Sequence, residues 1–351
     1  MTFLRTSASC TPSNFGTPMR LGAACAVAAK SAPKSALRIS ARKPIETRGA
    51  FVVTRQQITI RKDSFTRSAT LARAVPVIAV LAAGLACATP GPRIIYDRTS
   101  SFGRVLVMDE GPRRVMRLGS LEGSEQSAIE PKNPRAVPVE YVRYALIGLA
   151  HQGRPRRVLM VGLGGGTFTT LVHRALPDAT IDAVEIDPVV VEAARAHFGL
   201  REDARYHVHV ADAADWMKRG AETYDFVLLD AYAGEEIPAA LGTEAFFRAV
   251  ARRLAPGGVV AINIAEMEAE GRAVTRAFAR VLTPFDWRRT PVDGNVLLFA
   301  ASGPHAVDTA GVQRWLAEWD ARGVTDFSVA ALAARRAPAP ECAAIGADPS
   351  P

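Results

Sequence analysis

The chain has 351 residues, of which 48% are hydrophobic and 22% charged, so it has the composition of a soluble globular protein of one to three domains. Its four cysteines exclude a disulfide framework, because none lies between Cys87 and Cys342. The formal charge of +8 comes from residues 1–90, where 13 basic residues face two acidic ones, and the rest carries a net −3. General affinity for nucleic acid is therefore not expected.

Residues 1–91 form a leader without a sustained helical or strand pattern over its first 70 positions. A composition rich in Ser, Thr, Ala and Arg is typical of a transit peptide, and an over-extended gene start would look the same. The segment 74–87 is apolar, follows several basic residues and has the length of a secretion signal rather than of a membrane span. It ends in Gly-Leu-Ala-Cys, which resembles a bacterial lipoprotein box with Cys87 as the lipidated residue.

We therefore predict a membrane-associated, lipoprotein-like protein, with a cytoplasmic location as the alternative. An uncleaved hydrophobic anchor or a buried helix would also explain the apolar segment.

Alternating apolar and polar residues after the leader predict a small antiparallel β unit within residues 92–152. The expected strands are 93–97, 103–109 and 113–118. The last two are separated by Glu110-Gly111-Pro112, which favours a hairpin turn. Residues 122–138 are polar and rich in proline, so we expect a loop there, followed by a helix at 139–150.

Residues 153–336 show a strict alternation of strands and helices, which predicts an α/β fold with a Rossmann-like, doubly wound sheet. The first strand, 157–162, is apolar throughout, as in a parallel strand that is buried on both faces. Pro256-Gly257-Gly258 is expected to form the turn before the strand at 259–264. Asp293-Gly294 indicates a final hairpin, so the last strand should be antiparallel, and residues 337–351 should form a loose tail.

A glycine-rich turn follows the first strand of this sheet, in the sequence VLMVGLGGGTF. Its glycines are Gly162, Gly164, Gly165 and Gly166. The absence of Cβ atoms allows unusual backbone angles and the close approach of a ligand. No Gly-Lys-Ser/Thr follows, so a phosphate loop of the nucleotide hydrolase type is not expected.

Acidic residues end three successive strands of the predicted sheet. Glu185 lies 19 residues after Gly166, where an acid accepts hydrogen bonds from both ribose hydroxyls of a nucleoside. Asp212 follows the next strand and could accept the amine of an adenine, or merely cap the helix that it begins. Asp230 closes the fourth strand. Because ligand crevices open at the carboxyl ends of such strands, these acids and the glycine turn predict one nucleoside site.

The order GLGGGT, VEIDP, ADA, LLDA and LAPGGVVAIN resembles the class I S-adenosylmethionine-dependent methyltransferase superfamily and, more narrowly, the spermidine synthase (polyamine aminopropyltransferase) family. The resemblance covers about residues 93–301 and includes the small β unit. It implies that Glu185 holds the ribose and that Asp212, beside Ala213, reads the adenine. It also implies that Gln126 lies near the nucleoside and that Asp230 is the catalytic residue, which deprotonates or orients the amine.

The sequence departs from this family in the part that binds the amine. The acid of the family's glycine loop falls on Gly165, its second amine-binding acid falls on Ala233, and Arg143 stands where an acid helps to bind a diamine. Because diamines are dications, which carboxylates select, these changes argue against an ordinary polyamine pocket. Tyr141 and Tyr232 remain as candidate substrate-binding residues.

Glu235 and Glu236 lie a few residues after the altered positions and could partly replace the lost acids. His207 and His209 alternate on one strand, but a metal site needs a third ligand, so no metal is expected.

The leading interpretation is a transferase that uses decarboxylated S-adenosylmethionine as co-substrate and passes its aminopropyl group to an amine. The alternatives are a methyltransferase that uses S-adenosylmethionine and a non-catalytic, membrane-tethered nucleoside-binding protein. The expected partner is a small-molecule amine and not a nucleic acid. Membrane anchoring through residues 74–87 and a homodimer are both compatible with the sequence.

Overall fold

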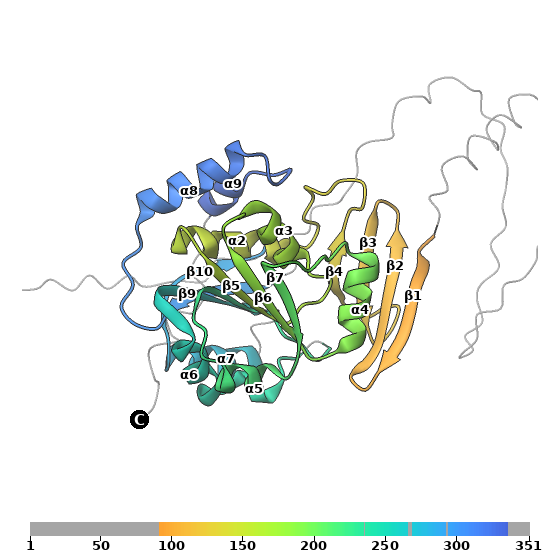
Figure 1. The fold of residues 1–351 in the computed structure, drawn as a ribbon, viewed down its shortest axis with the longest axis horizontal. Coiled ribbons are helices and arrows are strands. Elements are labelled where there is room, and N and C mark those ends of the chain that lie inside the picture. The colour runs from red at the N-terminus through yellow and green to blue at the C-terminus, as the bar shows by residue number, and fades with distance from the viewer. Residues whose placement is uncertain (1–90, 235, 266–268, 293, 336–351) are drawn as a thin grey trace, which may run out of the picture. The chain divides into compact units, whose positions relative to one another are not determined.

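The computed structural model describes residues 91–234, 236–265, 269–292 and 294–335 (Figure 1). The apolar segment 74–87, with Cys87, lies outside the described residues, and so do Glu235 and the tail 337–351. No helix in the described ranges is long and apolar enough to cross a membrane.

The small N-terminal unit is an antiparallel sheet of four strands in sequential order. They are β1 (Arg93–Ser100), β2 (Gly103–Glu110), β3 (Arg113–Leu118) and β4 (Glu125–Ile129). The predicted hairpin turn between β2 and β3 is confirmed, since Glu110 pairs with Arg113. We expected a loop throughout residues 122–138, and this is wrong for Glu125–Ile129, which form β4. The segment is short and of weak strand propensity, and its pairing with β3 stabilises it.

The main sheet has seven strands in the order β10-β11-β9-β8-β5-β6-β7. They are β5 (Arg157–Val161), β6 (Thr180–Glu185), β7 (Tyr206–Val210), β8 (Tyr224–Leu229), β9 (Leu254–Ile264), β10 (Thr283–Arg289) and β11 (Val296–Ala301). Strands β5 to β9 pair in parallel, whereas β11 is antiparallel to both β9 and β10. The predicted doubly wound sheet with an antiparallel last strand is therefore confirmed.

Strand β9 begins earlier than the sequence suggested. The expected turn at residues 256–258 is a bulge within this strand, because the pairing with β8 passes from Tyr224–Leu254 directly to Phe226–Val259. The φ of Gly257, 74°, provides the left-handed backbone that the bulge requires.

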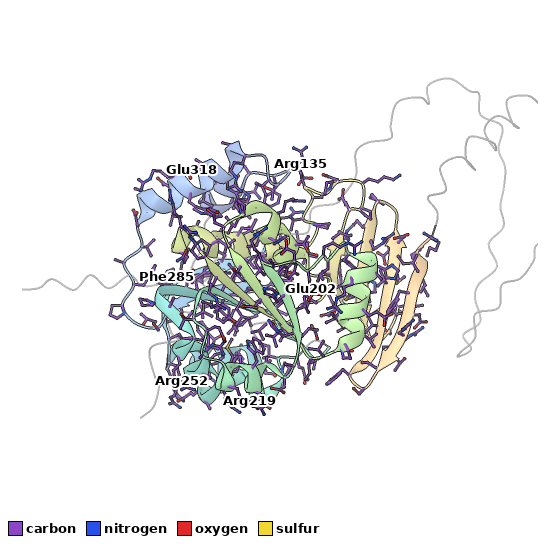
Figure 2. All side chains as sticks on the ribbon, viewed as in Figure 1. Arg135, Glu202, Arg219, Arg252, Phe285 and Glu318 are labelled. Carbon is purple, nitrogen blue, oxygen red and sulfur yellow. The ribbon has the colours of Figure 1, made fainter. Side chains whose placement is uncertain are left out.

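Helices cover both faces of the main sheet (Figure 1). The first face carries α2 (Glu140–Gln152), α3 (Thr167–Ala175), α4 (Pro188–His197), α8 (Thr309–Ala321) and α9 (Val329–Ala334). The other carries α5 (Ala213–Arg219), α6 (Glu244–Arg252), α7 (Ala269–Ala279) and the short 3₁₀ helix η1 (Ala239–Gly242). Charged residues such as Arg219 and Arg252 lie on the outer surface of these helices (Figure 2).

Burial on two faces explains the apolar run in β5. Val158 and Met160 pack in the core with α2 and α3, whereas Leu159 and Val161 pack in the core with α5, α6 and α7. Helix α4 also packs against the small sheet through Val190. This contact brings the N-terminal unit to the carboxyl ends of β5 and β6, where the predicted site lies.

Candidate active site

The glycine turn after β5 is packed against the neighbouring strand β8. A Cβ atom on Gly162 would lie 2.1 Å from the carbonyl oxygen of Asp230, so only glycine fits there. Gly162, Gly164 and Gly166 have φ values of 84°, 52° and 69°, which side chains disfavour. Gly165 instead has no room for a side chain, because its Cβ would touch Phe198. The turn thus brings its backbone to the end of β8.

Glu185 ends β6 directly beside this turn. Its Oε2 accepts a hydrogen bond from the backbone N–H of Leu163 at 2.9 Å, and its Oε1 accepts one from that of Asp187 at 3.0 Å. Burial raises the pKa of Glu185, and the two backbone donors oppose that rise. The carboxylate is therefore fixed in orientation next to the glycine turn, as a ribose-binding acid requires.

The predicted adenine position lies between the ends of β6 and β7. Ile186 and Val210 are 43% and 52% exposed there, which is unusual for such large apolar residues and suits the faces of a planar base. Asp212 accepts a hydrogen bond from the backbone N–H of Asp215 at 3.0 Å, so it does cap α5. Ala213 is buried as the first residue of that helix.

The small sheet contacts the site at two points. The Oγ of Ser100 donates to Oδ2 of Asp187 at 2.6 Å, and the hydroxyls of Ser127 and Thr167 are 3.0 Å apart. Gln126 lies in β4, where a Cβ on Gly164 would be 3.5 Å from its carbonyl oxygen, and its side chain donates to the Oγ of Ser124. Gln126 is thus next to the glycine turn, and its position near a bound nucleoside stays a prediction.

Asp230 lies at the end of β8 and accepts hydrogen bonds on both carboxylate oxygens. The hydroxyl of Tyr141, from α2, donates to Oδ2 at 2.5 Å, and the amide of Asn263, from β9, donates to Oδ1 at 2.9 Å. Burial raises the pKa of Asp230 to about 6, against the lowering effect of these two donors. Such a carboxyl can exchange a proton near neutral pH.

Asn263 and Asn295 are parts of this site that the sequence reasoning missed. Asn263 is only 3% exposed, and its Oδ1 accepts a hydrogen bond from the side-chain amide of Asn295 at 3.1 Å. The available signal was one amide within the apolar segment VVAINI, since a buried polar side chain needs a partner.

Tyr232 contacts the backbone of the same strand. Its hydroxyl donates to the carbonyl oxygen of Asn263 at 2.7 Å and accepts from the N–H of Ala265 at 2.8 Å. Burial raises its pKa, so the phenol stays neutral. Its predicted role in substrate binding stays a prediction, and the observed contacts hold the end of β9.

Arg143 does not extend toward Asp230. Its Nε donates to the carbonyl oxygen of Val137 at 2.6 Å, and its guanidinium lies 5.2 Å from the centroid of the Phe327 ring. Tyr141 and Arg143 are two positions apart on α2, and side chains with that spacing point to different sides of a helix. The inference that Arg143 opposes a diamine in the pocket is therefore wrong.

The loop after β8 turns sharply beyond Tyr232. The N–H of Ala233 donates to the carbonyl oxygen of Glu236 at 2.8 Å, and Glu236 is exposed.

The paired histidines of β7 have other contacts. Nε2 of His209 lies 2.8 Å from Oδ1 of Asp182, and its ring is 4.2 Å from that of Trp216. Across the described ranges, no three His, Cys, Asp or Glu side chains gather in a way that could hold a metal ion.

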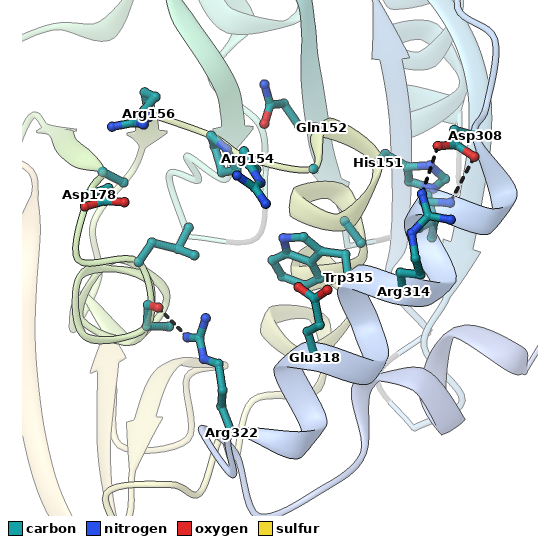
Figure 3. Close-up of a pocket in the computed structure, with 18 of the residues that line it drawn as sticks. His151, Gln152, Arg154, Arg156, Asp178, Asp308, Arg314, Trp315, Glu318 and Arg322 are labelled. Atoms are coloured by element: carbon teal, nitrogen blue, oxygen red, sulfur yellow. Dashed lines mark hydrogen bonds and ion pairs between the residues drawn. The ribbon is translucent and has the colours of Figure 1, made fainter.

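A cavity of about 580 Å³ lies at the opposite edge of the sheet, beside the carboxyl ends of α2 and α3 (Figure 3). Residues around it include His151, Arg154, Asp178, Arg314, Trp315 and Glu318. None of the predicted site residues lines this cavity. We therefore place the active site by its chemistry, at the carboxyl ends of β5 and β8. Between these two neighbouring strands the order in which the chain adds strands to the sheet reverses, and such points bind ligands.

Comparison with known proteins identifies the family. A family model described as "Spermine/spermidine synthase domain" matches residues 144–282. The polyamine aminopropyltransferase of Neisseria meningitidis serogroup A is 32% identical over 215 residues, which cover 59% of this chain and 80% of that protein. The chain belongs to the spermidine synthase family. The enzyme of the same name from Vibrio vulnificus is 33% identical over 175 residues, so the chain spans only 58% of that relative's length.

The chain is also similar to a methyltransferase homolog and to a solved spermidine synthase structure. A segment of 76 residues is 46% identical to the "eEF1A lysine and N-terminal methyltransferase homolog" of Drosophila melanogaster, covering 21% of this chain and 11% of that protein. A solved spermidine synthase "in Complex with Transition State Analogue AdoDATO" has a TM-score of 0.52 at 18% identity, covering 65% of this chain and 78% of that structure. The structural likeness supports the fold alone.

Proposed function

We propose that the protein transfers an alkyl group from a sulfonium nucleoside to an amine, and that this group is the aminopropyl group of decarboxylated S-adenosylmethionine. The observation that carries the proposal is the position of Asp230. This carboxylate has two hydrogen-bond donors and lies beside the glycine turn, within the electrostatic influence of Glu185. The carboxyl ends of the strands thus offer a surface suited to a nucleoside beside a group suited to an amine, which supports the proposal.

The nucleoside half fits such a co-substrate. Glu185 offers a fixed carboxylate to the ribose diol, and the exposed Ile186 and Val210 offer apolar surface at the ends of β6 and β7. The glycine turn leaves its backbone open where Cβ atoms would otherwise lie.

Asp230 would act on the acceptor. An alkyl ammonium has a pKa of about 10.4, so it is almost fully protonated at neutral pH and has no lone pair for attack. Asp230, ionised above its pKa of about 6, attracts the ammonium and receives its proton, directly or through water. The amine nitrogen then bonds to the carbon next to sulfur, and the broken C–S bond leaves its electron pair on a neutral thioether.

A methyl transfer is the second candidate, and two observations favour it. The crowding at Gly165 excludes an acid that could contact the aminopropyl amine, and a segment of 76 residues is 46% identical to a methyltransferase homolog. In that reaction the same Asp230 would serve the acceptor amine, and only the co-substrate would differ.

Product analysis separates these functions. The full chain is incubated with decarboxylated S-adenosylmethionine or with S-adenosylmethionine, each with putrescine, butylamine or a short peptide with a free N-terminus. Formation of methylthioadenosine and an aminopropylated amine supports the leading proposal. Formation of S-adenosylhomocysteine alone favours methyl transfer. Nucleoside binding without either product would overturn both and leave a binding protein.

A further inference from the structure

The turn between β10 and β11 is connected to both hydrogen-bond donors of Asp230. The turn is closed by the N–H of Thr290, which donates to the carbonyl oxygen of Asn295 at 2.8 Å. From this turn the N–H of Val292 donates to Oε2 of Glu140 at 2.9 Å, and Glu140 directly precedes Tyr141. The side chain of Asn295 holds the other donor, Asn263, at 3.1 Å. This turn, which begins 60 residues after Asp230, thus hydrogen-bonds both to the residue before Tyr141 and to Asn263.

The hydrogen bond from Asn295 to Asn263 fixes which end of the Asn263 amide faces Asp230. A primary amide has an accepting oxygen and a donating NH₂ group, so Asn263 can face Asp230 with either. Asn295 gives its NH₂ to the Oδ1 of Asn263, which leaves the NH₂ of Asn263 for Oδ1 of Asp230. The reversed amide would place oxygen against carboxylate oxygen, with no hydrogen between them.

We propose that Asn295 is a positioning residue of the active site, which acts through Asn263 to keep the carboxylate of Asp230 ionised and fixed in orientation. The importance of this role for transfer rests on the proposed function, in which Asp230 receives a proton from the amine. Among the described residues, Asn295 donates to Asn263 and not to Asp230 itself, so its effect must pass through the intervening amide.

The charges around Asp230 give the direction of the effect. Burial raises the pKa of Asp230, and the charge of Glu185 adds to that rise, whereas the donors Tyr141 and Asn263 lower it. The charge of Asp230 in turn adds to the burial that raises the pKa of the Tyr232 phenol. Loss of the donor from Asn263 would leave the raising influences less opposed, so Asp230 would be protonated at a higher pH and would receive a proton less readily.

The substitution Asn295→Asp tests this directly, because a carboxylate of the same shape cannot donate to Asn263. The amide of Asn263 should then turn its NH₂ toward position 295 and its oxygen toward Asp230. Asn295→Ala removes the donor without adding a charge, which separates amide orientation from repulsion. Asn133→Asp is the matched control, since Asn133 donates to Asp326 in a loop away from the site.

The measurement is a ¹³C NMR titration of the aspartate carboxyl groups in the full chain, with the signal of Asp230 assigned by its loss in Asp230→Asn. A hydrogen bond to a charged group contributes about 1.5 kcal/mol, which corresponds to a pKa shift of about one unit. We expect an upward shift of at least that size in Asn295→Asp, a smaller upward shift in Asn295→Ala, where Asn263 loses its support but can still donate to Asp230, and none in Asn133→Asp. Any transfer activity should show its acid limb displaced by the same amount.

The outcomes distinguish this inference from the proposed function. An unchanged titration of Asp230 in both Asn295 variants would overturn the role of Asn295, even if transfer occurs. The expected shift in a protein that transfers no alkyl group would support the positioning role and count against the proposed function. A shift in Asn133→Asp as large as those at position 295 would also overturn the inference, because the effect would not depend on the amide relay.

Discussion

Gly165 is packed so closely against Phe198 that no side chain fits between them. A Cβ atom at position 165 would lie 2.5 Å from Cδ1 of Phe198 and 2.8 Å from Oγ of Ser127. Phe198 is 4% exposed and packs with residues of the small sheet and α4, so its ring cannot easily move. An acid at position 165 would therefore add a steric clash as well as a charge.

Restoring that acid should damage the fold rather than create a diamine site. We expect Gly165→Asp to lower the free energy of unfolding by about 1–3 kcal/mol, as overpacking does in a closely packed core. Urea denaturation measures it. The control is Gly303→Asp, because Gly303 has no atom within 4 Å of its Cβ position and no positive φ. An unchanged stability with a gain of putrescine turnover would contradict this prediction.

Glu185 should be required for nucleoside binding. Each charge-assisted hydrogen bond to the ribose contributes about 1.5–3 kcal/mol, so Glu185→Ala should weaken the binding of methylthioadenosine at least tenfold. Calorimetric titration gives the affinity directly. Glu192→Ala is a suitable control, because Glu192 lies on the neighbouring helix α4 and forms an ion pair with the exposed Arg98. Equal affinities of the Glu185 variant and the wild type would remove the ribose role.

Arg143 should contribute to packing and leave amine selection unaffected. Its side chain joins the carbonyl oxygen of Val137 to the ring of Phe327, away from Asp230. We therefore expect Arg143→Glu to reduce thermal stability and to leave the ratio of putrescine to butylamine turnover unchanged. That ratio is measured by mass spectrometry of the products. A variant that gained diamine turnover would place position 143 in the pocket after all.

Membrane attachment is a prediction from the sequence alone. We propose that Cys87 is lipidated, so a bacterial host should place the full chain in the membrane fraction and Cys87→Ser should release it or leave a longer, unprocessed form. Fractionation and mass spectrometry of the N-terminus measure both. Equal solubility of the two proteins, with an intact leader, would exclude the lipoprotein interpretation.

The sequence predicted those elements whose residues have one dominant physical role. Strand β5 is apolar because both its faces are buried, and the glycine turn must lack Cβ atoms because Gly162 touches the backbone of Asp230. These signals lie within a few neighbouring residues, and the structure confirms the elements they predict.

The remaining features depend on contacts between distant residues. Strand β4 forms only because β3 pairs with it, and Asn263 acquires its orientation from Asn295, 32 residues later. Arg143 was matched to a motif position, but the phase of the helix decides where its side chain points. A sequence pattern carries no information about such pairings until the fold is known.

The ionised form of Asp230, which the proposed reaction needs, should lower the free energy of unfolding above pH 6. Its folded pKa of about 6 exceeds the ordinary value of about 3.9, so the folded state holds this proton more tightly than the unfolded chain. The resulting stabilisation is fully present below pH 4 and is lost as the pH rises through 6. Above that pH the buried charge carries a cost on the order of 1–3 kcal/mol.

Asp230→Asn should remove both the destabilisation by the buried charge and the proposed alkyl transfer. Its unfolding free energy should match that of the wild type near pH 4 and exceed it at pH 8, as measured by denaturation at both pH values. Transfer by the wild type should rise through pH 6, whereas the variant should be about 100- to 10,000-fold slower and lack that acid limb. Methylthioadenosine should bind both proteins equally through Glu185. A variant that is equally active, or destabilised at pH 8, would show that Asp230 is a structural residue and not the acceptor of the amine's proton.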